Sequence, residues 1–243
     1  MNSRILFKKI DSTLRGHIGA EIAALLSARQ GTTGSPLRQR TIIVLAPAFP
    51  ALGRTTVQGR QLLNGIPLED TELWQGETIA DNASLLDMMS RSNLKSELVP
   101  IQTVRAGARA IRAAMIDIAD RIDILVCDAQ TEEHLAAVAQ ASLDIDFDPV
   151  WAGSAGLIGH LLDAAELSRQ RRGLPQFSSF AGPSLFVIGS RSSVSRRQAE
   201  LLAAEDIIVL AIGEPTFDDV TADVVIRFLN CLYDRRDRNT YAP

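Results

Sequence analysis

The sequence has few cysteines and no long apolar run. Its 243 residues include two cysteines, Cys127 and Cys231, which are far apart and lack the spacing of metal ligands. Cys127 lies within an apolar run, where a free thiol acts as a small hydrophobic side chain. No stretch of about 18 apolar residues is present, which excludes a membrane-spanning helix. Polar residues near the N-terminus exclude a secretory signal peptide. We therefore expect a cytoplasmic protein.

Positive charge is also scarce. The 25 lysines and arginines are outnumbered by 29 aspartates and glutamates, which gives a formal net charge of −4. A basic surface for nucleic acid is not expected from this balance. The short basic run at 235–238 is interrupted by an acid and is typical of a solvated tail. We expect no nucleic-acid or membrane partner.

Apolar runs and helical periodicity alternate along the chain. Continuous apolar runs at 41–46, 122–128 and 184–189 predict strands that are buried on both faces. This alternation predicts an α/β protein, in which helices cover both faces of a parallel sheet and form three layers. Ligands of such folds bind beyond the carboxyl ends of the strands. Further strands are predicted at 98–104 and 207–211, and helices at 18–29, 108–120, 132–143, 155–166 and 195–204.

A change in composition divides the chain. Residues 167–183 are rich in Arg, Gln, Ser, Pro and Gly, which predicts a linker. One domain would then occupy residues 1–166. Residues 184–243 are too few for a stable domain, because domains below about 70 residues rarely hold together alone. They are expected to begin a second α/β domain.

The first polar motif is KKIDSTLRGHIGAE, residues 8–21. Asp11 and Ser12 can cap the helix that follows, and Gly16 allows a ligand to approach the backbone. Lys9 and Arg15 add positive charge, and an arginine can bind a carboxylate through two hydrogen bonds. A capped helix with solvated lysines is the alternative interpretation.

The second motif is APAFPALGRTTVQG, residues 46–59, which follows a predicted strand. Its prolines and Gly53 predict a rigid loop that presents Arg54 and two threonine hydroxyls. That combination suits an anionic, hydroxylated small molecule. The alternative is a turn in which proline and glycine serve the backbone alone.

Two later motifs each precede a predicted helix. In WAGSAGL, residues 151–157, small residues around Ser154 allow backbone amides to approach a ligand oxygen. The glycine at 153 rather than 152 excludes the G-x-S-x-G elbow of serine hydrolases. In VIGSRSSVSRRQ, residues 187–198, amides and hydroxyls form a candidate phosphate site. A capped turn without a ligand is the alternative, and the motif is not a Walker A loop.

Taken in order, these motifs resemble the four-carbon acid sugar kinase family. The strings KKIDSTLRGHIGAE, APAFPALGRTTVQGRQLLNGIPLEDTEL, LVCDAQTEEHL, WAGSAGL and GSRSSVSRRQ carry the resemblance, from Lys8 to about Gly213. It implies a two-domain kinase that uses ATP and Mg²⁺ to phosphorylate a hydroxyl of a four-carbon sugar acid such as threonate or erythronate. The sugar acid would bind to residues 1–166 and the nucleotide to the domain that begins at 184–243.

The resemblance also implies site residues. It identifies no catalytic residue and no metal ligand. Gln130 stands where the family commonly has an acid, which weakens the case for a polar role of the loop at Asp128. The implied acid-binding residues are Lys9, Asp11, Ser12, Arg15, Gly16, Gly53 and Arg54, and the implied nucleotide-binding residues are Gly189, Ser190, Arg191 and Ser192.

Two family motifs have no counterpart in this sequence. The family carries Ala-Asp-Asp-x-Thr-Gly-Ala before KKIDSTLRG, and a motif resembling Gly-Gly-Asp-Thr near its end. We therefore expect a kinase interior that is inactive, lacks the strands that support the loop at 8–16, and self-associates through exposed sheet edges. A non-catalytic small-molecule-binding or interaction module is the alternative. A secreted effector ranks last, because no secretion signal is evident.

Overall fold

Two apolar segments form the middle of a parallel sheet. Strands β2 (Thr41–Ala46) and β7 (Ile124–Cys127) consist entirely of buried residues, as their sequences predict. The structure is a computed structural model, and it describes residues 5–31, 40–74, 82–167, 188 and 193–203. Within these residues five strands pair in parallel, in the order β1-β8-β2-β7-β6. The predicted parallel sheet is confirmed.

The three remaining strands of this sheet differ from the predictions. Strand β6 is Ser96–Val99 and not 98–104, because a helix, α3 (Ile101–Arg105), begins directly after Pro100. Strand β8 (Asp148–Gly153) was not predicted. The expectation that the loop after residue 8 lacks a supporting strand is wrong, since β1 (Phe7–Lys9) pairs with β8.

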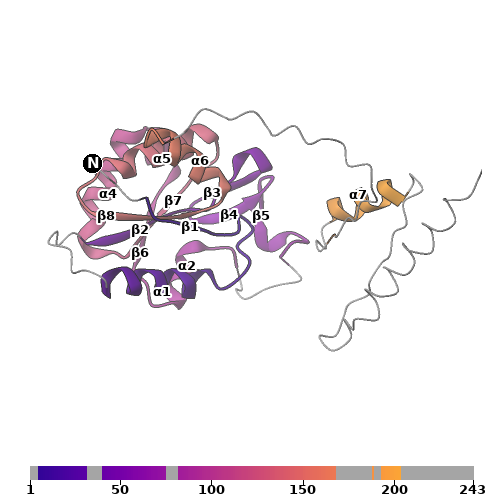
Figure 1. Cartoon of the computed structure of the whole chain (residues 1–243), viewed down its shortest axis with the longest axis horizontal. Helices are drawn as coiled ribbons and strands as arrows, with labels where there is room; N and C mark the ends of the chain where they lie inside the picture. Colours follow the sequence, from indigo (N-terminus) through magenta and orange to yellow (C-terminus); the bar gives the residue numbers. More distant parts are fainter. Residues whose placement is uncertain (1–4, 32–39, 75–81, 168–187, 189–192, 204–243) are drawn as a thin grey trace, which may run out of the picture. The chain divides into compact units, whose positions relative to one another are not determined.

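Helices cover both faces of the sheet (Figure 1). Successive side chains of β2 point to opposite faces. Ile42 and Val44 join one apolar core with α4 (Ala108–Ile118), α5 (Glu132–Leu143) and α6 (Ala155–Ala164). Ile43 and Leu45 join a second core with α1 (Ile18–Gly31) and α2 (Leu85–Arg91). The predicted three-layer α/β architecture is confirmed, and Cys127 is buried in the first core.

A small antiparallel sheet lies outside these layers. It consists of β3 (Arg54–Val57), β4 (Arg60–Leu63) and β5 (Ile66–Pro67). Two-residue turns join its strands, at 58–59 and 64–65, and both residues of each turn have positive φ, as in type I′ hairpins. The prediction of a rigid loop is therefore wrong beyond Gly53. Short 3-10 helices occur at η1 (Pro50–Leu52), η2 (Leu68–Asp70) and η3 (Ala119–Arg121).

The chain divides into two compact units, Met1–Pro175 and Gln176–Pro243. In the second unit the structure describes one helix, α7 (Ser193–Ala203), close to the predicted 195–204. The strand predicted at 207–211 lies outside the described residues, as does that at 184–189 apart from Ile188. The assignment of domain functions stays a prediction.

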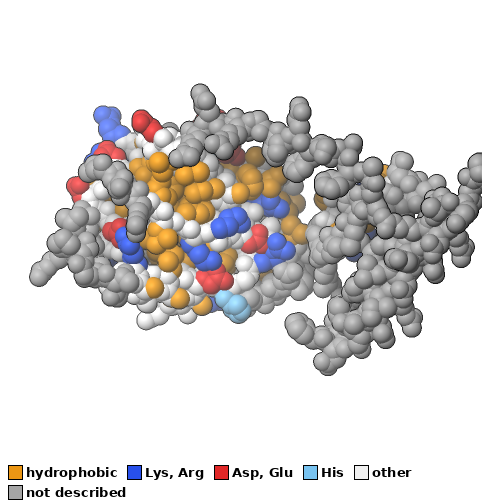
Figure 2. Space-filling view, in the orientation of Figure 1, with side chains coloured by type: hydrophobic (Ala, Val, Ile, Leu, Met, Phe, Trp, Pro, Cys, Tyr) orange, Lys and Arg blue, Asp and Glu red, His pale blue; other side chains and the backbone are white. Residues whose placement is uncertain are grey.

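The surface of the described residues mixes charges of both signs. On the face drawn in Figure 2, Lys and Arg side chains lie among Asp and Glu side chains and apolar groups. Among the helices that the structure describes, none has the length and apolar character needed to cross a membrane.

Asp148 links the end of α1 to the start of β8. Its carboxylate accepts hydrogen bonds from Arg29 (2.8 and 3.0 Å) and from the hydroxyl of Thr41 (3.0 Å). The hydrogen bond from Arg29 is the main reason that the pKa of Asp148 lies below its usual value. The ionised form is therefore stabilised in the folded protein, and this stabilisation is present at neutral pH and lost as the pH falls through the folded pKa.

We expect Asp148→Asn to lower the free energy of unfolding by about 1 kcal/mol at pH 7, a modest value because Arg29 is 42% exposed. The difference from the parent should shrink below about pH 4, where the unfolded carboxyl also takes up a proton. Urea unfolding at both pH values measures it. Asp117→Asn is the control, because Asp117 is 77% exposed. A difference that stays constant with pH would contradict the prediction.

Candidate functional site

The predicted polar motifs of the first unit meet at the carboxyl edge of the parallel sheet. Strand β1 ends at Lys9 and leads into loop 11–16, while β2 ends at Ala46 and leads into the segment before the small sheet. Strands β8 and β7 end at Gly153 and Cys127. Parallel sheets bind their ligands at this edge, so the structure places the candidate site where the topology predicts it.

Loop 11–16 is organised around the carboxylate of Asp11. Its Oδ2 accepts a hydrogen bond from the Thr13 hydroxyl at 2.7 Å and forms an ion pair with Arg15. Burial opposes the charged form, but the hydrogen bonds from Arg15 and Thr13 outweigh it and lower the pKa of Asp11. Asp11 is therefore ionised at neutral pH and can accept a hydrogen bond from a ligand hydroxyl.

Two other predicted residues at this loop are Lys9 and Gly16. Lys9 Nζ donates to the carbonyl oxygen of Ile10 at 2.7 Å, whereas the neighbouring Lys8 pairs with Glu21 on α1. Gly16 has a φ of 93°, and nothing lies within 4 Å of the position that a Cβ would take. A glycine is needed there for its backbone conformation.

Gly53 and Arg54 lie where η1 leads into β3. Gly53 has a φ of 69°, and a Cβ on it would lie 2.0 Å from Oδ1 of Asn64. The glycine is thus required by its conformation and by a close contact. Arg54 Nε is buried and has no hydrogen-bond partner among the described residues. A buried donor without a partner requires an explanation, and an anionic ligand provides one.

Arg54 lies on the same face of the small sheet as Thr56, because residues two apart on a strand share a face. Thr56 is directly opposite Gln61, and the Nε2 of Gln61 donates to the carbonyl oxygen of Ser12 at 2.9 Å. The structure therefore brings the first motif and the second motif together through Gln61. Sequence reasoning missed this residue.

Asp128 attaches the small sheet to the parallel sheet. Its side chain is completely buried, and its carboxylate accepts hydrogen bonds from the backbone N–H groups of Gln58 (2.8 Å), Gly59 (2.9 Å) and Ile101 (3.0 Å). Burial raises the pKa of Asp128, and the three donors oppose that rise. The expectation against a polar role for this loop is wrong, because the aspartate binds main-chain groups from two separate segments.

Ala129 extends this attachment. Its backbone exchanges hydrogen bonds of 2.8 and 3.0 Å with that of Thr56. The small sheet is therefore anchored at β7 and reaches loop 11–16 after β1, although β8 and β2 lie between these strands. The small sheet therefore spans the carboxyl edge of the parallel sheet from β7 to β1.

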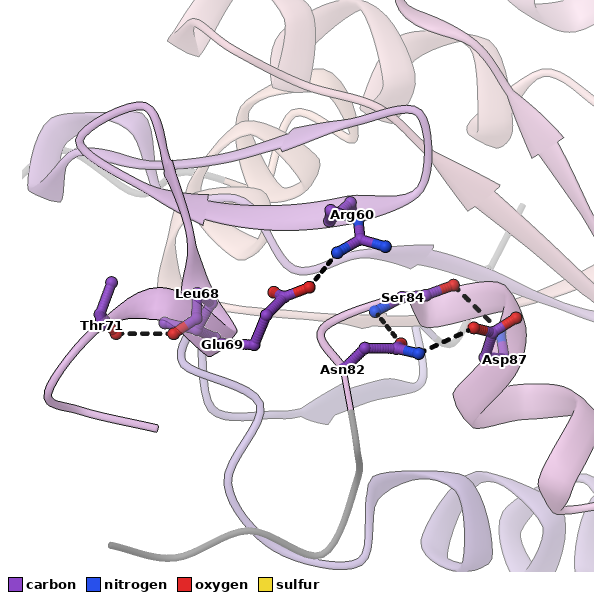
Figure 3. Close-up of polar contacts among 7 residues, drawn as sticks. All are labelled: Arg60, Leu68, Glu69, Thr71, Asn82, Ser84 and Asp87. Carbon is purple, nitrogen blue, oxygen red and sulfur yellow. Dashed lines mark hydrogen bonds and ion pairs between the residues drawn. The ribbon is translucent and has the colours of Figure 1, made fainter. Parts of the chain in front are cut away.

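The opposite side of the small sheet contacts η2 and the start of α2 (Figure 3). Arg60 on β4 forms an ion pair with Glu69 of η2. Ser84 caps α2 through the backbone N–H of Asp87, and Asn82 also donates to the Asp87 carboxylate at 3.1 Å. The Arg60–Glu69 ion pair ties one face of the small sheet to η2, and an isolated bridge between Arg60 and Ser84 joins β4 to the start of α2. Arg54 lies on the other face.

Ser154 has a structural role in the described part of the chain. Its hydroxyl donates to the carbonyl oxygen of Ala48 at 2.5 Å and accepts from the backbone N–H of Gly156 at 3.0 Å. It thereby caps α6 and joins it to the segment after β2. His160 lies 2.8 Å from Glu132, whose other oxygen accepts from the backbone of Ala51. The Ser154 hydroxyl thus pairs with main-chain groups, and His160 with a carboxylate of α5.

The predicted nucleotide-binding residues, Gly189, Ser190, Arg191 and Ser192, lie outside the described residues. Within the described ranges, no group of three or more His, Cys, Asp or Glu side chains is arranged to hold a metal ion. We therefore assign no Mg²⁺ ligand to this part of the chain.

Known proteins share sequence with most of this chain. The family model described as "Sugar-binding N-terminal domain" matches residues 1–161. The chain is 42% identical to a D-threonate kinase of Cupriavidus necator, with 82% of this chain and 46% of the relative covered. It is 30% identical to a D-erythronate kinase of Heliobacterium modesticaldum, with 79% and 41% covered.

A solved structure is also similar. It is that of a Bordetella bronchiseptica protein described as a domain of unknown function with bound citrate, a domain-swapped dimer. It has a TM-score of 0.50 and 25% identity, and 98% of this chain and 52% of that chain are covered. The chain thus spans about half the length of its relatives. The match over residues 1–161 and these identities show that the chain belongs to the four-carbon acid sugar kinase family.

Proposed function

We propose that residues 1–166 bind the sugar-acid substrate of an ATP-dependent four-carbon acid kinase. In this proposal residues 167–183 are a linker, and residues 184–243 begin the nucleotide-binding domain. The observation that carries the proposal is the meeting of loop 11–16 with the Arg54 face of the small sheet through Gln61. Similarity to D-threonate and D-erythronate kinases supports it.

The chemistry of the loop and the small sheet matches a small polyhydroxy carboxylate. The guanidinium of Arg54 suits the carboxylate, which it can bind through two parallel hydrogen bonds. The Asp11 carboxylate and the Ser12 hydroxyl suit the substrate hydroxyls, and Lys9 and Arg15 add positive charge. The citrate of the Bordetella bronchiseptica relative is itself a hydroxy carboxylate. No side chain is assigned as the catalytic base.

ATP would supply the phosphoryl group. Gly189, Ser190, Arg191 and Ser192 are proposed to hold its phosphates through backbone amides and hydroxyls near the start of α7. Self-association is a further part of the proposal, supported by the domain-swapped dimer of the Bordetella bronchiseptica relative; analytical ultracentrifugation measures it.

The test is calorimetric titration of the chain with D-threonate, D-erythronate and, as control, succinate. Succinate has carboxylates on a four-carbon chain but no hydroxyls. We expect at least one of the two sugar acids to bind more tightly than succinate, because only they can use Asp11 and Ser12. No binding of either would refute the proposal.

A second measurement addresses catalysis. ADP release is followed with ATP, Mg²⁺ and the sugar acid that binds. Substrate-dependent ADP release supports the kinase function. Binding of the acid without ADP release supports the acid-binding role alone and favours the non-catalytic alternative.

A further inference from the structure

Gln61 joins β4 of the small sheet to loop 11–16 inside the protein. Its side chain is completely buried, and its Nε2 donates a hydrogen bond of 2.9 Å to the backbone carbonyl oxygen of Ser12, which is itself 7% exposed. Water cannot easily replace either group at such a site. Losing the glutamine amide would therefore leave the Ser12 carbonyl without its buried partner.

Thr56 holds the other end of the Gln61 amide. The threonine hydroxyl, also completely buried, donates to Oε1 of Gln61 at 2.7 Å. The Ser12 carbonyl can only accept, so the NH₂ group of Gln61 points to it and Oε1 points to Thr56, whose hydroxyl can donate. Thr56 in turn is held by the backbone hydrogen bonds to Ala129 after β7. A continuous set of hydrogen bonds thus runs from the end of β7 to the loop after β1.

This set of bonds ends on a backbone atom between Asp11 and Thr13, so it fixes the main chain of the loop and not one side chain. At its other end, Thr56 is two residues from Arg54 and on the same face of β3. Gln61 therefore connects the loop that carries Asp11 and Ser12 to the strand face that carries Arg54.

We infer that Gln61 is a positioning residue, which holds the hydroxyl-binding loop at a fixed separation from Arg54 by its hydrogen bond to the Ser12 carbonyl. The inference rests on the proposed function, since the separation matters only if both groups bind one ligand. Gln61 does not contact that ligand itself. Its effect is transmitted through the loop.

The replacement Gln61→Met tests the inference, because methionine has a similar length but neither donates nor accepts a strong hydrogen bond. Thr56→Val removes the hydroxyl at nearly constant side-chain shape, whereas Thr56→Ser retains the hydroxyl. Ser142→Ala is the matched control. Ser142 is also completely buried and accepts a hydrogen bond of 2.8 Å from Trp151, but it lies on α5.

Two measurements on the full chain read out the effect. Hydrogen–deuterium exchange of residues 11–17 should become about tenfold faster in Gln61→Met, while exchange of β2 and β7 changes no more than in Ser142→Ala. The D-threonate dissociation constant should rise about tenfold in Gln61→Met, because the binding groups are misplaced relative to each other. Thr56→Val should also raise the exchange rate and the dissociation constant. Thr56→Ser should leave both at the parent values.

Three results would overturn the inference. The first is exchange that accelerates equally across the domain in Gln61→Met, which indicates general loss of stability. The second is unaltered exchange at 11–17, and the third is faster exchange with an unaltered dissociation constant. If the parent binds neither D-threonate nor D-erythronate, the proposed function fails, and exchange alone decides: selective acceleration supports the coupling of Gln61 to the loop, and uniform acceleration refutes it.

Discussion

Asp128→Ala is expected to lower the free energy of unfolding by about 3–4 kcal/mol, the largest effect of the substitutions considered for this protein. The carboxylate is completely buried and satisfies the backbone N–H groups of Gln58, Gly59 and Ile101. Alanine leaves all three donors without a partner. Backbone groups cannot be replaced, so only local unfolding can return them to water.

Asp128→Asn separates charge from hydrogen bonding. The amide keeps one oxygen acceptor but places an NH₂ group against at least one N–H donor, so we expect a loss of about 2 kcal/mol. Urea unfolding followed by circular dichroism measures both variants. Asp117→Ala, at a carboxylate that is 77% exposed, should stay within about 0.5 kcal/mol of the parent. A loss below about 1 kcal/mol in Asp128→Ala would mean that the small sheet is held mainly by other contacts.

Arg54→Met is expected to raise the D-threonate dissociation constant about 100-fold, within the range for losing hydrogen bonds between charged groups. Arg54 Nε is buried without a partner among the described residues, so the guanidinium has a donor available for a ligand carboxylate. Arg54→Lys should recover only part of the affinity, because an ammonium lacks the planar pair of donors. Calorimetric titration distinguishes the three proteins.

Arg60→Met is the matched control for Arg54. Arg60 lies on the same small sheet but opposite Val57, hence on the other face, where it pairs with Glu69. Its loss should reduce stability but leave the D-threonate dissociation constant within about twofold. Equal effects of the two replacements on binding would show that the net charge of the sheet matters and that Arg54 has no specific contact with the acid.

The central strands were predictable because local sequence determines them. The segments of β2 and β7 are short, apolar and fully buried. They therefore show no alternation of polar and apolar residues that would make a strand harder to identify. Strand β8 was missed because its sequence, DPVWAG, begins with a helix-capping residue and a proline and ends with glycine. Its strand conformation comes from pairing on both sides, with β1 and β2, which periodicity cannot reveal.

The β4–β5 hairpin of the small sheet could have been predicted from one dipeptide. Asn64-Gly65 lies between apolar residues, and this pair is the strongest short signal for a two-residue hairpin. Part of the candidate site was readable in the same way, because Asp11, Ser12 and Arg54 are polar residues beside strand ends. Asp128 and Gln61 were not readable, since their partners are backbone atoms of distant segments and leave no side-chain pattern.

Strand β1 has a consequence for the order in which the protein is assembled. Within the described residues its one neighbour in the sheet is β8, and the residue after it, Ile10, donates its N–H to the carbonyl oxygen of Gly153 at 2.8 Å. Because β8 follows loop 11–16 in the chain, a ribosome has to translate residue 153 before the loop has this support. Such non-local pairing forms late and slowly. A nascent chain interrupted before β8 would carry Asp11, Ser12 and Arg54 but could not yet hold them in place for a ligand.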